Sequence, residues 1–171
     1  MKKLSIIICI FTLLLSSLLA GCGSKEPAPA ADHKLRVVVT FNAIKEFTQA
    51  VGQDKIHITS LIPDGTEPHD FQPTTKTMQA LSKADILIYN STGMERWVEQ
   101  ATQAAANPKL VIVEAAKDTD RISLTEADEI RAHGQYDPHT WLSLSCAQTE
   151  VKNIACLLYT SPSPRDRSVS R

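Results

Sequence analysis

The fold is decided by a ten-residue stretch in the middle of the chain, LSKADILIYN (residues 81–90). Its first part continues a helical pattern, because Met78, Leu81 and Ala84 lie on one face of a helix. Its second part, Asp85–Tyr89, contains a short continuous apolar run, which is typical of a strand that is buried on both faces. The stretch therefore predicts a helix that leads directly into a buried strand of a parallel sheet.

The same alternation of strand and helix extends to both sides of this stretch. Further strands are expected at Leu35–Thr40, Ile56–Ile62 and Leu110–Val113, and helices at Ala43–Val51, from Thr74 or Thr75, at Glu95–Ala106, near Glu126–Arg131 and from around Ser143. This alternation predicts an α/β fold with a mostly parallel sheet flanked by helices. In such folds, ligands bind outside the carboxyl ends of the strands.

The amino terminus has the pattern of an export signal. Two lysines precede an apolar stretch from Leu4 to Leu19, which is shorter than the roughly 20 residues of a membrane span. LAGC (residues 19–22) resembles the lipobox of bacterial lipoproteins, so residues 1–22 are expected to be a leader and Cys22 the site of lipidation. An ordinary cleaved signal is the alternative. Residues 23–33 are expected to be a flexible spacer before a folded region that starts near Lys34.

The carboxyl terminus breaks from the amphipathic pattern. Residues 156–171 resemble the conceptual translation of a transposase-type sequencing adaptor, so we expect the native sequence to extend only to about Ala155. A genuine Ser-, Pro- and Arg-rich disordered tail is the alternative. Residues 34–142 are then expected to form one α/β lobe, and residues 143–155 the start of a further helix.

Charge and cysteine content exclude two classes of protein. The formal net charge is −1 and no basic stripe with interleaved aromatic residues appears, so nucleic acid is not an expected partner. The chain has four cysteines: Cys9 lies in the leader, Cys22 is the lipidation site and Cys156 lies in the doubtful tail. Cys146 alone remains in the folded region, so neither a disulfide framework nor a cysteine zinc cluster is expected.

Two histidines in proline-bounded loops are the candidate metal ligands. His69 lies in GTEPHDFQP (residues 65–73) and His139 in YDPHTWL (residues 136–142). Neutral imidazole is a common zinc ligand, and the fixed φ of a proline limits the entropy lost when a loop is held at a metal. Either histidine alone is weak evidence, since most loop histidines are surface residues. Glu67 and Asp70 are candidates to orient the imidazoles by hydrogen bonds, with simple solvation as the alternative.

Three segments in this order carry a resemblance to a known family: PDGTEPHDFQPT (residues 63–74), LSKADILIYN (residues 81–90) and YDPHTWLS (residues 136–143). Together they resemble the zinc/manganese solute-binding lipoproteins of ABC metal importers, over residues 35 to about 155. The resemblance implies two α/β lobes joined by one long helix that starts here at Ser143, with metal bound between the lobes.

The resemblance also implies roles for individual residues. It implies that His69 and His139 are the ligands supplied by the first lobe. The family's remaining ligands, a histidine or glutamate and an acidic residue, have no counterpart in this sequence, so binding weaker than in a complete protein is expected. His33, His57 and His133 are expected to be exposed, with low-affinity metal collection as an alternative for His133. The two tryptophans, at positions 97 and 141, are expected to be packing residues.

The expected function is capture of Zn²⁺, alternatively Mn²⁺, and its delivery to an ABC permease by a lipid-anchored, extracytoplasmic, monomeric protein that is not an enzyme. A third imidazole would favour zinc, and paired carboxylates would favour manganese. One alternative is a zinc hydrolase with Glu67 as general base, although no His-Glu-x-x-His spacing appears. A thiol hydrolase that uses Cys146 and His139 and a metal-binding surface adhesin are further alternatives.

Overall fold

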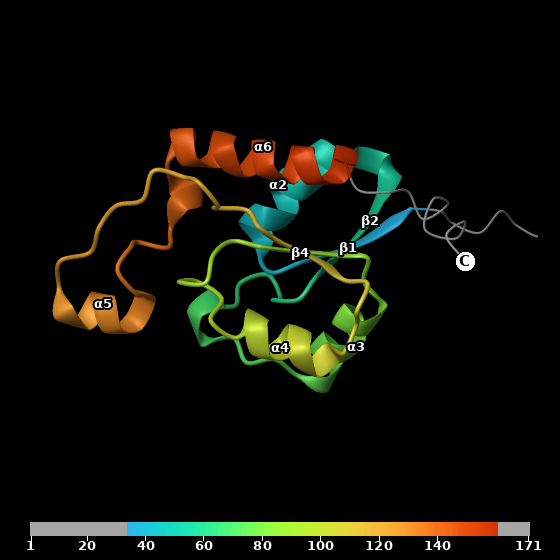
Figure 1. The fold of residues 1–171 in the computed structure, drawn as a ribbon, viewed down its shortest axis with the longest axis horizontal. Coiled ribbons are helices and arrows are strands. Elements are labelled where there is room, and N and C mark those ends of the chain that lie inside the picture. Colours follow the sequence, from blue (N-terminus) through green and yellow to red (C-terminus); the bar gives the residue numbers. More distant parts are fainter. Residues whose placement is uncertain (1–33, 161–171) are drawn as a thin grey trace, which may run out of the picture. The chain divides into compact units, whose positions relative to one another are not determined.

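The computed structural model describes residues 34–160, and within them the predicted alternation of strands and helices is confirmed (Figure 1). The strands are Leu35–Val39 (β1), Ile56–Ser60 (β2), Ile86–Tyr89 (β3) and Val111–Glu114 (β4). The helices are Asn42–Gly52 (α2), Thr75–Lys83 (α3), Val98–Ala105 (α4), Ala127–His133 (α5) and Leu144–Thr160 (α6), with 3-10 turns at Gln53–Lys55 (η1), Pro68–Asp70 (η2) and Thr140–Leu142 (η3).

The strands form a parallel sheet, as the apolar runs predicted, and their order in the sheet is β2-β1-β3-β4. Val37 of β1 is in register with Ile58 of β2 on one side and with Ile86 of β3 on the other. Parallel neighbours require a crossover connection, and helices supply it here. The central strands are therefore covered on both faces, and all four residues of β3 are buried.

Two helical layers cover the sheet, with α2 and α6 on one face and α3 and α4 on the other (Figure 1). Successive side chains of a strand point to opposite faces, so β1 contributes to both cores. Val37 and Val39 pack in the cluster that contains Ile154 of α6, whereas Val38 packs in the cluster that contains Leu81 of α3. The predicted α/β class with helices on both faces is confirmed.

The long loop between β2 and α3 is bounded by local signals that the sequence contained. The backbone N–H of Thr66 donates to the carbonyl of Pro63 at 3.1 Å, and Gly65 adopts a φ of 82°, which favours glycine. At the other end, the Thr74 hydroxyl accepts from the backbone N–H of Thr77, whose own hydroxyl accepts from the backbone N–H of Thr74. This capping box starts α3 at the predicted position.

Two helix boundaries differ from the prediction. Helix α4 begins at Val98 instead of Glu95, because the Glu95 side chain turns inward and bonds to the chain before it. Helix α6 continues past Ala155 to Thr160, and Leu157 and Leu158 pack against the core next to α2. Where the native sequence ends stays a prediction.

The remaining structural expectations concern the ends of the chain and His57. The leader, Cys22, the spacer with His33 and the last eleven residues (161–171) lie outside the described residues. His57 on β2 is exposed, as predicted. No helix between residues 34 and 160 is long and apolar enough to cross a membrane.

Candidate metal site

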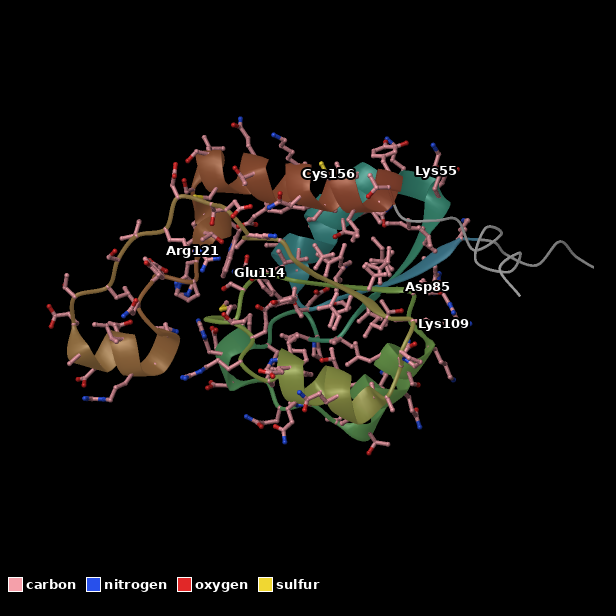
Figure 2. The ribbon with its side chains drawn as sticks, viewed as in Figure 1. Lys55, Asp85, Lys109, Glu114, Arg121 and Cys156 are labelled. Atoms are coloured by element: carbon pink, nitrogen blue, oxygen red, sulfur yellow. The ribbon has the colours of Figure 1, made fainter. Side chains whose placement is uncertain are left out.

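The site lies at the carboxyl ends of the parallel strands, where the fold predicted it. Glu114 and Arg121 mark this end of the sheet, with Arg121 Nη2 3.1 Å from Glu114 Oε1 (Figure 2). Lys55, Asp85 and Lys109, which precede strands, lie at the opposite end. The loop after β2 and the loop before α6 therefore meet at the carboxyl ends of the strands.

The two predicted ligands, His69 and His139, are brought together. They are 70 residues apart in sequence, yet their Nε2 atoms lie 3.2 Å apart and their ring centroids 5.2 Å apart. Two nitrogens that bind one zinc ion at about 2.0–2.1 Å with a tetrahedral angle would stand about 3.3 Å from each other. The observed separation of the Nε2 atoms therefore fits a pair of imidazoles that share a metal ion.

Asp137 orients the ring of His139, a role that the sequence prediction missed. Its Oδ1 lies 2.7 Å from His139 Nδ1 and also accepts the backbone N–H of His139 at 2.9 Å. These bonds leave Nε2 facing His69, as in the carboxylate–histidine–metal arrangements of known metal sites. The backbone hydrogen bond from His139 lowers the pKa of Asp137, so the carboxylate stays ionised. The sequence signal that could have indicated this role is an acidic residue, Asp137, two positions before His139 and separated from it by Pro138.

Glu67 and Asp70, the acids predicted to orient the imidazoles, lie beside His69. Glu67 Oε1 accepts the backbone N–H of His69 at 3.4 Å and so caps the turn η2. Among the hydrogen bonds described for residues 34–160, none joins Glu67 or Asp70 to an imidazole nitrogen, so their orienting role stays a prediction. Burial, followed by the charges of His133 and His139, lowers the pKa of His69 and favours the neutral ring that binds metal.

Buried hydrogen bonds hold the His139 loop against the sheet and α6. Asn90, just after β3, donates from Nδ2 to the carbonyl oxygen of Pro138 at 2.7 Å. The hydroxyl of Thr140 donates to Glu150 Oε1 of α6 at 2.6 Å. Burial raises the pKa of Glu150, whose side chain is fully enclosed. The residues on both sides of His139 are therefore fixed by partners from two other elements.

A buried carboxyl group, that of Glu95, lies in the loop that follows β3. Its Oε1 accepts from the Thr40 hydroxyl at 2.5 Å and from the backbone N–H of Asn90 at 2.9 Å, and its Oε2 accepts from the backbone N–H of Ser91 at 3.0 Å. Burial raises the pKa of Glu95 to about 7. The group links the carboxyl ends of β1 and β3. No local pattern in the sequence indicated this inward orientation.

His133 does not lie where the sequence prediction placed it. It was expected to be exposed, but its side chain is only 18% exposed and its ring centroid is 4.5 Å from that of His69. The segment Ile122–Leu124 pairs with Gln135–Asp137, which turns α5 back beside the site. Even so, within residues 34–160 no group of three or more His, Cys, Asp or Glu side chains is arranged to hold a metal ion.

The structure also bears on the thiol hydrolase alternative, through Cys146, and on the predicted packing role of the two tryptophans. Cys146 is buried and its Sγ donates to the carbonyl oxygen of Asp120 at 3.3 Å, so nothing supports a thiol nucleophile there. Trp141 packs on Phe41 with ring centroids 4.8 Å apart, and Trp97 packs on Phe71 at 5.1 Å. Both tryptophans are packing residues, as predicted.

Comparisons with known proteins agree with this geometry. The chain matches the family model described as zinc-uptake complex component A, periplasmic (ZnuA), over residues 37–163. It is 39% identical over 148 residues to the high-affinity zinc uptake system protein ZnuA of Bacillus subtilis (strain 168), which covers 80% of this chain and 46% of the relative. It is 31% identical over 159 residues to the manganese ABC transporter substrate-binding lipoprotein PsaA of Streptococcus pneumoniae, with 91% and 50% covered.

A solved structure, the metal-dependent lipoprotein YcdH from Bacillus subtilis, has the same fold. It superposes with a TM-score of 0.63 and 42% sequence identity, covering 73% of this chain and 44% of that chain. The chain thus spans about half the length of the relatives that it matches. Since the family model covers most of the chain and the strand order and histidine pair occur together, the chain belongs to the ZnuA family of zinc/manganese-type ABC solute-binding proteins.

Proposed function

We propose that this protein captures a divalent transition metal ion outside the cytoplasmic membrane and delivers it to an ABC permease, with Zn²⁺ preferred to Mn²⁺. The observation that carries the proposal is the pair of imidazoles, His69 and His139, whose Nε2 atoms lie 3.2 Å apart. Asp137 supports the pair by holding the ring of His139. Capture and release of an ion form and break only coordinate bonds to the metal, with no covalent change in a substrate, so no catalytic residue is needed.

The donor atoms are the reason for preferring zinc. Imidazole nitrogen suits zinc and other late first-row metals, whereas manganese favours carboxylate, carbonyl and water oxygens. His69 and His139 both offer nitrogen, and their loops place the rings at a spacing that suits tetrahedral zinc. The relatives include proteins named for zinc and for manganese, so family membership alone does not decide between the two metals.

Catalysis is not favoured by any observation of the site. The family is one of transport solute-binding proteins and is not an enzyme family. The carboxylate of Glu67, which a zinc hydrolase would use as general base, accepts the backbone N–H of His69 instead. No feature of the described residues favours an adhesin either.

The proposed location rests on the lipobox at residues 19–22 and on relatives that are named lipoproteins. Lipidation at Cys22 would hold the protein at the membrane that contains its permease. Metabolic labelling with a fatty acid tests this step: label should appear in the wild-type protein and be lost in Cys22→Ser. Equal label in both proteins would refute the anchor.

Calorimetric titration tests metal capture directly. Zn²⁺ and Mn²⁺ are titrated into the chain from Gly23 to Arg171, which retains every described residue, and into its His69→Ala and His139→Ala variants. We expect one zinc ion to bind and either substitution to abolish binding. His57→Ala is the matched control, since this histidine is exposed on β2 and should leave affinity unchanged. Zinc binding that is indifferent to both substitutions would contradict the proposal.

A further inference from the structure

One face of the edge strand β2 is left open beside α3. β2 lies at the end of the strand order, and in its parallel register with β1 Arg36 stands beside His57. Two residues further along, Val38 stands beside Thr59. Alternate residues of a strand share a face, so these side chains all belong to the face on which Val38 packs against α3. His57 and Thr59 are nevertheless exposed, so β2 forms an open floor next to this helix.

Helix α3 forms the wall of a groove over this floor. The groove has a volume of about 290 Å³, and α3 lines it with residues at the spacing of one helical face, from Lys76 to Lys83. The two lysines are seven residues apart, which is about 10 Å along the helix axis. The basic residues of the lining are Arg36, His57, Lys76 and Lys83, and no acidic residue of the described chain lines the groove. We call it the basic groove.

The two lysines of the basic groove have no acidic partner within the described part of the chain. None of the ion pairs between residues 34 and 160 includes Lys76 or Lys83, and both lysines are exposed. Their charges therefore attract an anion without competition from a neighbouring carboxylate. Screening by salt is the main opposing effect, because both ammonium groups stand in water.

Arg36 adds a fixed guanidinium to the basic groove. Asp85 holds it through two hydrogen bonds, from Nε to Oδ2 at 3.2 Å and from Nη2 to Oδ1 at 3.1 Å. The pair leaves the other N–H groups of the guanidinium for a further acceptor. The side chain of Arg36 remains 57% exposed, so such an acceptor can reach it from solvent.

The chemistry of the groove suits a phosphate ester. Arginine binds phosphate oxygens through its planar fork of donors, and lysine binds them as a point charge. The groove has room for about ten water molecules at roughly 30 Å³ each. A phosphoglycerol headgroup has a similar number of non-hydrogen atoms, so the groove is large enough for one such group and too small for a folded partner.

The covalent chain connects the basic groove to the proposed membrane anchor. Residues 23–33 separate Cys22, the proposed site of lipidation, from Lys34, and Arg36 follows two residues later. Eleven residues span at most about 40 Å. A lipid on Cys22 would therefore keep the groove close to phospholipid headgroups, and a tether of this length gives a local concentration on the order of millimolar. A weak site is sufficient under these conditions.

We propose that the basic groove docks on the phosphate headgroups of anionic phospholipids, so that the edge strand β2 and α3 lie against the membrane surface. The inference is separate from metal capture and uses none of the candidate ligands. The proposed anchor serves only to identify a membrane, rather than another source of phosphate, as the partner. Each lysine near an anionic membrane surface strengthens binding by about fivefold.

Cosedimentation with vesicles tests the docking without the anchor, because the chain from Gly23 to Arg171 lacks Cys22. Equimolar phosphatidylglycerol–phosphatidylcholine vesicles are compared with vesicles of phosphatidylcholine alone at low ionic strength. We expect binding to the anionic vesicles only, and weaker binding as salt is added. The double variant Lys76→Gln/Lys83→Gln should bind about 25-fold more weakly, about fivefold for each lysine.

The matched control, Lys117→Gln/Lys152→Gln, removes the same charge from two exposed lysines outside the groove, after β4 and on α6. It should lose less than about threefold, because charges beyond a Debye length from the membrane are screened. An equal loss in the two double variants would overturn the inference, since net charge alone would then explain binding. Urea unfolding of each variant shows whether its fold is retained.

Two further outcomes would reject the membrane as partner. One is binding of the wild-type chain to anionic vesicles that is no stronger than to neutral vesicles. The other is saturable binding of inorganic phosphate, followed by amide shifts of Lys76 and Lys83, in a chain that does not bind vesicles. Neither outcome affects metal capture or lipidation of Cys22, which are measured by zinc titration and by fatty acid labelling.

Discussion

The direction in which one imidazole ring points decides whether the site can work. Asp137 bonds both the Nδ1 and the backbone N–H of His139, so the ring presents Nε2 to His69. A metal ion needs a neutral nitrogen with a free lone pair, and a carboxylate on the far side of the ring raises the basicity of that nitrogen. The geometry of Asp137 is therefore as important to the site as the identity of the ligands.

Replacing Asp137 by Asn should weaken zinc binding by about 10- to 100-fold, because a neutral amide orients and polarises the ring less well than a carboxylate. The measurement is competition against a chelator of known affinity. Asp128→Asn is the control, since that side chain is 86% exposed on α5 and should leave the affinity unchanged. Equal affinity for wild type and Asp137→Asn would show that the ring does not need this carboxylate.

Glu95 makes stability depend on pH. Burial raises its pKa from 4.5 to about 7, so between these values the folded state binds more protons than the unfolded state. The free energy of unfolding therefore falls as pH rises through this window. The loss is about 3 kcal/mol, at about 1.4 kcal/mol for each pH unit, and it is complete above the folded pKa.

Glu95→Gln should flatten this dependence, since an amide does not titrate. Urea unfolding at pH 5 and pH 8 measures the difference for each protein, and comparison with wild type cancels the contribution of other groups. Glu99→Gln, on the exposed side of α4, should retain the wild-type slope. A Glu95→Gln slope as steep as that of wild type would mean that another group causes the dependence.

At the scale of elements, the helices α2, α3, α4 and α6 each bury side chains against the rest of the fold, whereas α5 buries none. Leu81 of α3 is fully buried with Val38 and Leu87 in the cluster between the sheet and the helices α3 and α4. Leu144, at the start of α6, is 84% exposed. Burial of apolar surface, rather than apolar character alone, contributes to stability. The two leucines thus provide a matched comparison of the same substitution.

Leu81→Ala should lower the free energy of unfolding by about 2–5 kcal/mol, through lost burial and a cavity. Leu144→Ala should change it by less than about 0.5 kcal/mol, because it removes an exposed side chain. Urea unfolding at neutral pH measures both. A comparable loss for the two variants would contradict the packing described for α3 and α6.

At the scale of the whole molecule, the site depends on loops that come from distant parts of the sequence. Asn90, which follows β3, holds the loop that carries His139, and Glu150 of α6 holds the same loop from the other side. The two histidine loops meet only when the sheet and its helices are assembled. Binding of a metal ion and folding of this lobe should therefore be linked.

Zinc should raise the free energy of unfolding by about 2.7 kcal/mol at a free concentration 100 times its dissociation constant. Addition of a chelator should return stability to the metal-free value. His139→Ala should show no gain at the same zinc concentration, because one partner of the pair is missing. A gain of the same size in His139→Ala would indicate that zinc stabilises the protein at another place.

The sequence by itself determined the parallel α/β layer, the start of α3 and the choice of His69 and His139. These features are local: apolar runs, a capping box and proline-bounded loops each lie within a few residues of one another. The resemblance to the family of metal-binding lipoproteins is carried by the same segments of the sequence. For these reasons the sequence could predict the candidate ligands and a site outside the carboxyl ends of parallel strands, although it did not predict the order of the strands.

Only the tertiary structure decided the inward turn of Glu95, the role of Asp137 on the ring of His139, the hydrogen bond from Asn90 to Pro138 and the place of His133. The Asn90 contact joins residues 48 apart, and His133 reaches His69 because α5 folds back on a paired segment. A residue's spacing in sequence does not determine the direction of its side chain in a loop. That direction follows from the packing of loops and helices, and in this lobe it decides which groups face the candidate metal site.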